Sequence, residues 1–61
     1  MDVNKEDLAI ALWVEKKHGV DGAVYIAEQI GRLALENDTA GIARWKRIAV
    51  RFEALSQGAV Q

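Results

Sequence analysis

Few side chains in this sequence could do chemistry, and His18 comes first because it is the only histidine. Glu15 and Asp21 stand near it in the sequence, so the three could hold a metal ion or exchange protons. A zinc site, however, takes three or four ligands, mostly nitrogen or sulfur, and the chain has no cysteine. His18 follows two lysines and suits the last turn of a helix, where cations meet the negative end of the dipole. We therefore expect neither a metal site nor a cofactor.

Groups for nucleophilic or acid–base catalysis are equally scarce. Ser56 is the only serine, and Thr39, the only threonine, stands where a helix is expected to begin. The neighbouring acids Glu6 and Asp7 fit the first turn of a helix, where negative charge meets the positive end of the dipole. No glycine-rich stretch has the spacing of a phosphate-binding loop. These observations predict that the protein is not an enzyme.

A cluster of positive charges near the C-terminus is the strongest charge pattern. It forms a basic face of four residues: Arg44, Lys46, Arg47 and Arg51. These side chains could bind phosphates or an acidic protein. They could instead pair with the rest of the chain, because residues 1–38 carry a net charge of −4 and residues 39–61 a net charge of +3. We favour internal pairing, since an overall net charge of −1 is unlike that of a strongly basic nucleic-acid or membrane-surface binder.

A helix-turn-helix motif is the specific form that a DNA-binding function would take here. Ala27 and Gly31 match the small residues of its first helix and turn. The match then fails, because residues 32–35 continue the apolar helical spacing where the chain would have to turn. We therefore interpret Gly31 as a site where another helix packs closely. A small nucleic-acid-associated regulator that uses the basic face remains the alternative function.

Apolar residues at helical spacing place these groups on three helices, expected at about residues 5–18, 22–36 and 40–56. Asn4 and Asp21 are expected to cap the first two helices, and Gly19 to end the first. The segment 37–39 should end the second helix and cap the third, and residues 59–61 should fray. We expect one all-α domain over residues 1–61, a compact three-helix bundle. Connections of about three residues also permit an orthogonal arrangement.

The first expected helix differs from the other two, each of which has a single apolar face. Residues 8–14 are apolar around the whole circumference, which is typical of a helix buried on all sides. Three helices cannot surround one of their own members. The first helix should therefore lie between its neighbours with its far side on another subunit, or expose an apolar strip. We expect a homodimer or a helical protein partner, with four candidate interface residues: Leu8, Leu12, Trp13 and Tyr25. For Trp13, a place in the core is an equal alternative.

No segment resembles a signal peptide or a membrane span. The start is acidic and the apolar run of residues 8–14 is short, whereas a span needs roughly 20 apolar residues. The sequence therefore predicts a cytoplasmic protein that does not enter a membrane.

Four blocks of sequence resemble a family of short uncharacterised proteins from alphaproteobacteria. They lie at residues 11–16, 18–19, 26–31 and 41–45, and read Ala-Leu-Trp-Val-Glu-Lys, His-Gly, Ile-Ala-Glu-Gln-Ile-Gly and Gly-Ile-Ala-Arg-Trp. That family is a domain of unknown function with no established activity or ligand. The resemblance implies a stand-alone bacterial cytoplasmic protein and assigns no functional residue. Together with the apolar first helix, it leaves a non-enzymatic protein-interaction module as the favoured function.

Overall fold

The computed structural model describes residues 3–58, and this part of the chain is almost entirely helical. Helix α1 spans Val3–His18, a short 3-10 turn spans Gly19–Asp21, α2 spans Gly22–Leu35 and α3 spans Thr39–Gly58. The predicted all-α class is confirmed for the described residues. The predicted fraying of residues 59–61 lies outside them. Because α1 begins at Val3, Asn4 lies inside the helix and does not occupy the expected capping position.

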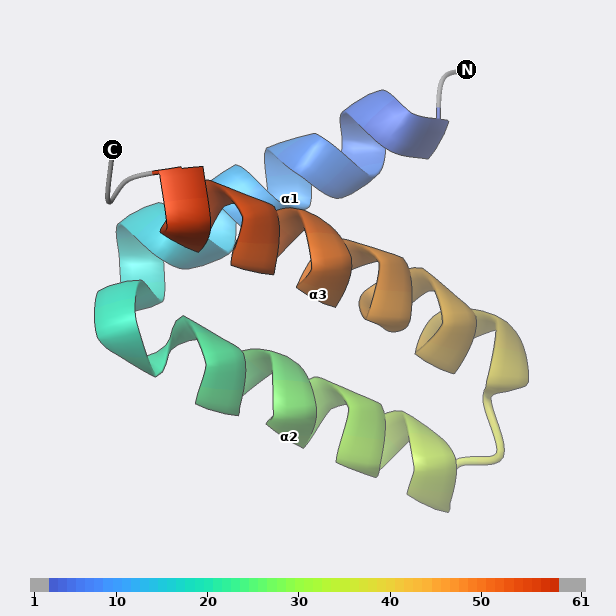
Figure 1. Ribbon diagram of the computed structural model, residues 1–61. Helices are drawn as coiled ribbons and strands as arrows, with labels where there is room; N and C mark the ends of the chain where they lie inside the picture. The colour runs from blue at the N-terminus through green and yellow to red at the C-terminus, as the bar shows by residue number, and fades with distance from the viewer. Residues whose placement is uncertain (1–2, 59–61) are drawn as a thin grey trace.

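Between residues 3 and 35, no non-helical connection separates the first two expected helices. Gly19–Asp21 form a turn of 3-10 helix, so the helical backbone continues from Val3 to Leu35 and bends at this turn (Figure 1). The described chain therefore contains two continuous helical segments, a long bent one and α3, and the prediction of three separate helices is wrong. Gly19 has a positive φ of 55°, a left-handed conformation that ends an α-helix without a side-chain clash.

The second connection matches the sequence more closely. Asn37 takes a left-handed φ of 60° just after α2 ends, and asparagine tolerates this conformation better than most residues. Asp38 then caps α3, because its Oδ1 accepts a hydrogen bond of 2.9 Å from the backbone N–H of Gly41. Asp21 holds the equivalent position before α2, but its side chain makes no capping hydrogen bond.

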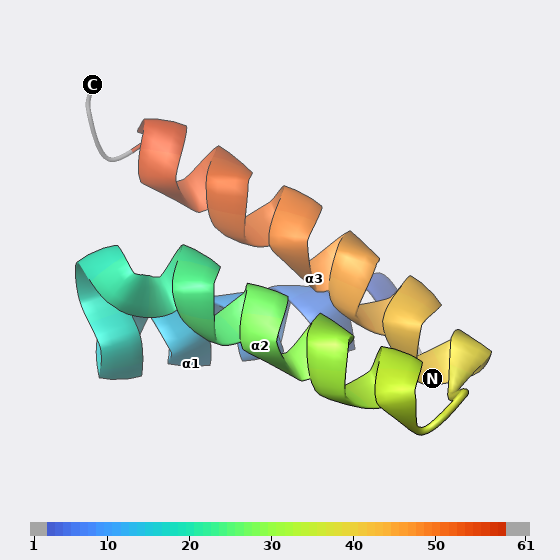
Figure 2. The same cartoon turned by 90° about the horizontal axis from the view of Figure 1, so that it is seen from below.

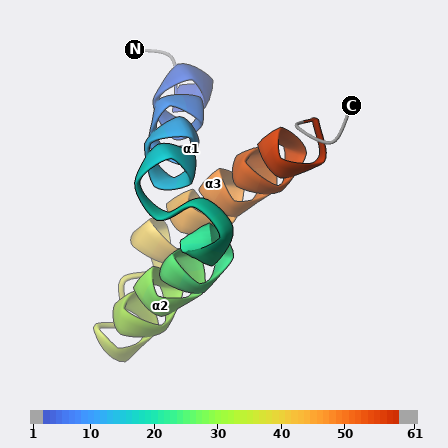
Figure 3. The ribbon, with the colours of Figure 1, turned by 90° about the vertical axis from the view of Figure 1, so that its left-hand side faces the viewer.

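Helix α3 is the central element of the fold. It packs along both α1 and α2, whereas α1 and α2 contact each other much less (Figure 3). Helices α2 and α3 run antiparallel and diverge toward the C-terminal end of α3 (Figure 2). The molecule is consequently flat, with extents of 38 × 28 × 16 Å. A bundle with three equal interfaces between helix pairs does not form, and α1 is left with an open side.

The core lies where α1 and α2 meet α3. Its buried members are Ala11, Val14, Ile26 and Ile48. Leu33 is also buried, farther along α2. Gly22 lies where α2 approaches Phe52 of α3, and a Cβ atom there would overlap the phenyl ring. Gly31 has open space around it, so the prediction that it is a close-packing site is wrong.

Candidate interaction surface

The open side of α1 carries the first two candidate interface residues. Leu8 is 40% exposed and Leu12 is 46% exposed, and they lie one helical turn apart. An adjoining side of the same helix supplies the core residues Ala11 and Val14. Helix α1 is apolar all round, but α3 covers only one of its sides. In the single chain this side of α1 is therefore uncovered, and both arrangements that the sequence left open, a contact with another subunit and an exposed strip, stay predictions.

Charged residues flank these leucines on the same side of α1. Counting about 100° per residue, Lys5, Leu8, Leu12 and Glu15 fall within a sector of roughly 80°. We call these four residues the outer stripe of α1. Both charged members are exposed, and Ala9 is exposed beside the leucines. The stripe is thus an apolar centre with a positive charge at one end and a negative charge at the other.

Trp13 and Tyr25 belong to a different surface from the outer stripe. The ring of Trp13 packs edge-on against Tyr25 at a centroid distance of 5.9 Å and against His18 at 5.7 Å. Tyr25 also stacks on His18 at 4.1 Å and meets Trp45 of α3 edge-on at 6.0 Å. We call these four rings the aromatic cluster, which ties the bend between α1 and α2 to α3. The structure therefore divides the four candidate interface residues into two separate pairs.

The two residues of the second pair differ in exposure. Trp13 is 48% exposed and does not belong to the core, so the core alternative for it is wrong and a place in an interface stays a prediction. Tyr25 is half-buried and packs against the core, whereas a candidate interface residue was expected to be exposed. The sequence spacing within α2 alone misplaced it, because Trp13 and His18 come from the preceding helix.

His18 uses its ring for packing. It is the last residue of α1, as expected, and its stacking partner Tyr25 fixes the plane of the imidazole. Within residues 3–58, no three or more His, Cys, Asp or Glu side chains come close enough to hold a metal ion together. The role of His18 that the geometry supports is therefore structural, as a ring in the aromatic cluster.

Two residues of the basic face bind acids at the start of α1. The Nε–H of Arg47 donates a hydrogen bond of 2.9 Å to Oδ2 of Asp7, and Nε of Arg44 lies 3.9 Å from the other oxygen. Arg44 also reaches Oε1 of Glu6 at 3.4 Å. Internal pairing, which the charge distribution favoured, is therefore present at Arg44 and Arg47. Glu6 and Asp7 join α1 to α3, and of the two only Glu6 lies in the first turn of α1.

Asp7 is the residue of this site that sequence reasoning missed. Its side chain is only 1% exposed, whereas Arg44 and Arg47 stay 43% and 49% exposed. Its Oδ1 atom is buried without a hydrogen bond and faces the guanidinium of Arg44. The signal was available, because Asp7 precedes Ala11 by four residues and Val14 by seven and so shares their core-facing side.

The remaining two residues of the basic face are Lys46 and Arg51. Lys46 is exposed on α3, and Arg51 takes part in a further interaction within the molecule. Arg51 and Val50 also line a shallow hollow beside Asp7 and Arg47. Two of the four residues of the basic face thus pair with one buried carboxylate, although their side chains stay 43% and 49% exposed.

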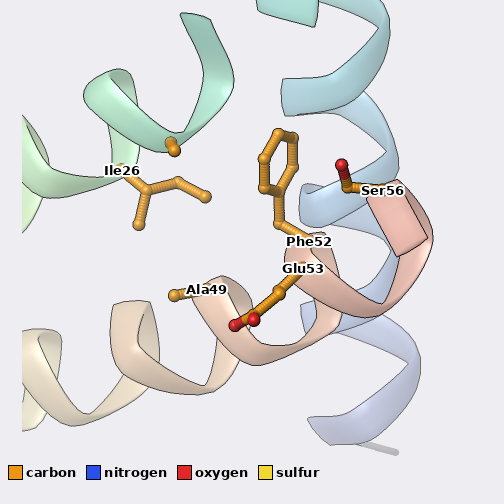
Figure 4. Close-up of a pocket in the computed structure, with 6 residues that line it drawn as sticks. Ile26, Ala49, Phe52, Glu53 and Ser56 are labelled. Atoms are coloured by element: carbon orange, nitrogen blue, oxygen red, sulfur yellow. The ribbon is translucent and has the colours of Figure 1, made fainter. Parts of the chain in front are cut away.

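A hollow of about 290 Å³ lies where α2 and α3 diverge. Figure 4 shows the side chains of Ile26 and Phe52 in this space, with Glu53 and Ser56 also lining it. Ala23 and Ala49 complete the lining. Ligand sites are usually of this volume or larger and enclose their ligand more fully. No histidine lines the hollow beside Ser56, so the serine has no imidazole base there.

These features describe a small all-α fold in which ring contacts and ion pairs join the helices. None of the helices between residues 3 and 58 combines the length and the apolar character that a membrane span requires. The chain belongs to a family of unknown function (DUF6961), whose model matches residues 3–59. This match confirms the family of unknown function that the four sequence blocks predicted. No curated protein and no solved structure matches the chain.

Proposed function

We propose that this protein is a non-enzymatic interaction module that self-associates through the outer stripe of α1. The observation that carries the proposal is the pair Leu8 and Leu12, which are 40% and 46% exposed one turn apart. Removing exposed apolar side chains from water favours association, by roughly 1.5–3 kcal/mol for a large side chain that becomes fully buried. We also propose that the protein works in the bacterial cytoplasm, which the resemblance of the four sequence blocks supports.

A second copy of the chain is the partner that best suits this surface. A two-fold contact uses one patch twice, so each leucine has a matching apolar surface opposite it. The net charge of −1 means that two copies repel each other only weakly. The patch is small, and interfaces of this size belong to the weak and transient class. We therefore expect a monomer–dimer equilibrium with a dissociation constant in the micromolar to millimolar range.

The geometry of the basic face lends less support to the nucleic-acid alternative. A phosphate that approached Arg47 would compete with Asp7, whose buried carboxylate accepts a hydrogen bond of 2.9 Å from that side chain. Arg44 is shared between Glu6 and Asp7 in the same way. Breaking such a pair leaves a buried charge without its partner, which is costly.

Sedimentation equilibrium from low micromolar to millimolar concentration tests the proposal. We expect the average mass to rise with concentration, and Leu12→Glu to keep the protein monomeric by placing a charge in the apolar centre. Leu35→Glu is the matched control, because Leu35 is 87% exposed at the end of α2 and away from the stripe. A wild-type protein that stays monomeric at millimolar concentration, or a dimer unaffected by Leu12→Glu, would refute self-association through α1.

A further inference from the structure

We infer that the two copies pair their α1 helices in an antiparallel arrangement with one defined register. Leu8 of each copy lies against Leu12 of the other, and Lys5 of each lies against Glu15 of the other. This inference rests on the proposed self-association and adds its direction and register. It follows from the order of residue types along the exposed side of α1.

The spacing of the outer stripe is symmetric. Its members stand at positions 5, 8, 12 and 15, so the steps along the helix are three, four and three residues. A two-fold axis at the level of residue 10 exchanges Leu8 with Leu12 and Lys5 with Glu15. One alignment of the two helices therefore makes the leucine contacts and the lysine–glutamate contacts at the same time.

The charges at the two ends of the outer stripe favour antiparallel over parallel pairing of the two α1 helices. An antiparallel pair brings Lys5 to Glu15 twice, whereas an in-register parallel pair brings lysine to lysine and glutamate to glutamate. Both side chains are exposed, and neither makes an ion pair with any other residue between 3 and 58. Antiparallel helices also place their dipoles favourably.

Charge reversal tests the direction. Lys5→Glu and Glu15→Lys should each raise the dissociation constant about tenfold, because each replaces two attractive contacts with two repulsive ones. The double variant K5E/E15K should return the constant to within about twofold of wild type. Both substitutions put the charge that suits the dipole at their end of α1, so neither is expected to unfold the helix. A double variant as weak as the single variants would overturn the antiparallel register.

Disulfide trapping tests the register directly, since the chain has no native cysteine. In the antiparallel pair two residues at position 5 lie about 15 Å apart along the axis, too far for a disulfide, which needs Cα atoms within about 7 Å. Lys5→Cys and Glu15→Cys should therefore cross-link efficiently only when the two variants are mixed, with one isotopically labelled so that mass spectrometry identifies the mixed product.

The possible outcomes distinguish the antiparallel register from self-association through α1 in general. Cross-linking of each cysteine variant with itself shows a parallel pair and overturns the inference. A dimer by sedimentation that gives no preferential mixed cross-link shows another register and also overturns it, while leaving self-association intact. A wild-type monomer at every concentration removes both. Mixed cross-linking together with rescue by the charge swap supports the antiparallel pair.

Discussion

Replacing Asp7 with asparagine is the most informative perturbation of the fold. The carboxylate is 1% exposed, accepts a hydrogen bond of 2.9 Å from Arg47, and lies 3.9 Å from the guanidinium of Arg44. Asp7→Asn keeps the size of the side chain but removes its charge. The hydrogen bond from Arg47 is charge-assisted at both ends, and such a bond contributes about 1.5–3 kcal/mol.

Two features of the site limit how much Asp7→Asn lowers the free energy of unfolding. Arg44 and Arg47 are 43% and 49% exposed, so they regain water when Asp7 loses its charge, and the full cost of stranding a buried ion does not arise. The asparagine amide can still accept one hydrogen bond from Arg47. We therefore expect Asp7→Asn to lower the free energy of unfolding by about 2 kcal/mol, which corresponds to a melting temperature roughly 10 °C lower in a domain of this size.

Glu6→Gln is the matched control. Glu6 is the neighbouring acid and pairs with Arg44 at 3.4 Å, but both side chains are exposed by about two-fifths, at 41% and 43%. Exposed pairs contribute at most about 1 kcal/mol and often nothing measurable, so we expect a change of less than about 0.5 kcal/mol. Urea unfolding followed by circular dichroism and tryptophan fluorescence measures both variants. If Asp7→Asn cost no more than Glu6→Gln, burial would not be what gives Asp7 its structural role.

The remaining predictions concern the packing of α2. Gly22→Ala should destabilise the protein by about 1–3 kcal/mol in thermal unfolding, because the new methyl group overlaps the ring of Phe52. Gly31→Ala should stabilise it by roughly 0.5–1 kcal/mol, since the site is open and alanine is the better helix former; a loss of stability there would show an unrecognised close contact. Tyr25→Leu should cost about 1–2 kcal/mol and weaken the near-ultraviolet circular dichroism, because it removes one ring-stacking contact and two edge-on contacts. Tyr25→Phe keeps the ring, so its stability should stay close to that of the wild type. A loss of stability as large as that of Tyr25→Leu would show that the hydroxyl group, and not the ring, makes the stabilising contribution.

Local signals in the sequence were enough to find the helices. Apolar spacing placed the ends of α1, α2 and α3 within two residues of the observed ends, although α1 and α2 are joined through the 3-10 turn. Gly19 takes the left-handed φ expected at the end of α1, and the segment 37–39 contains Asp38, which caps α3. These signals work because helix ends are decided by short-range hydrogen bonds and by φ angles that few residues adopt. The sequence also favoured pairing of the basic face with the acidic half of the chain, since net charge can be counted without knowing the fold.

The sequence could not decide how the helices meet. It predicted a break at residues 19–21, where the backbone instead continues as a 3-10 turn, and this difference depends on what the following helix packs against. It assigned close packing to Gly31, whereas the close contact is between Gly22 and Phe52 of α3. Asp7 was interpreted as a dipole partner only, because the arginines that bind it are about forty residues away.

The clearest division between sequence and tertiary structure is on α1. Its composition alone determined that an apolar surface is left over, because residues 8–14 are apolar on every side and two neighbours cannot cover them all. Only the tertiary structure decides which of these residues remain exposed. Helix α3 lies at the centre of the fold and covers the side of α1 that bears Ala11 and Val14. Leu8 and Leu12 stayed exposed, while Trp13 joined the rings of the aromatic cluster. Periodicity defines the faces of a helix, but the crossing of its neighbours decides which face is buried.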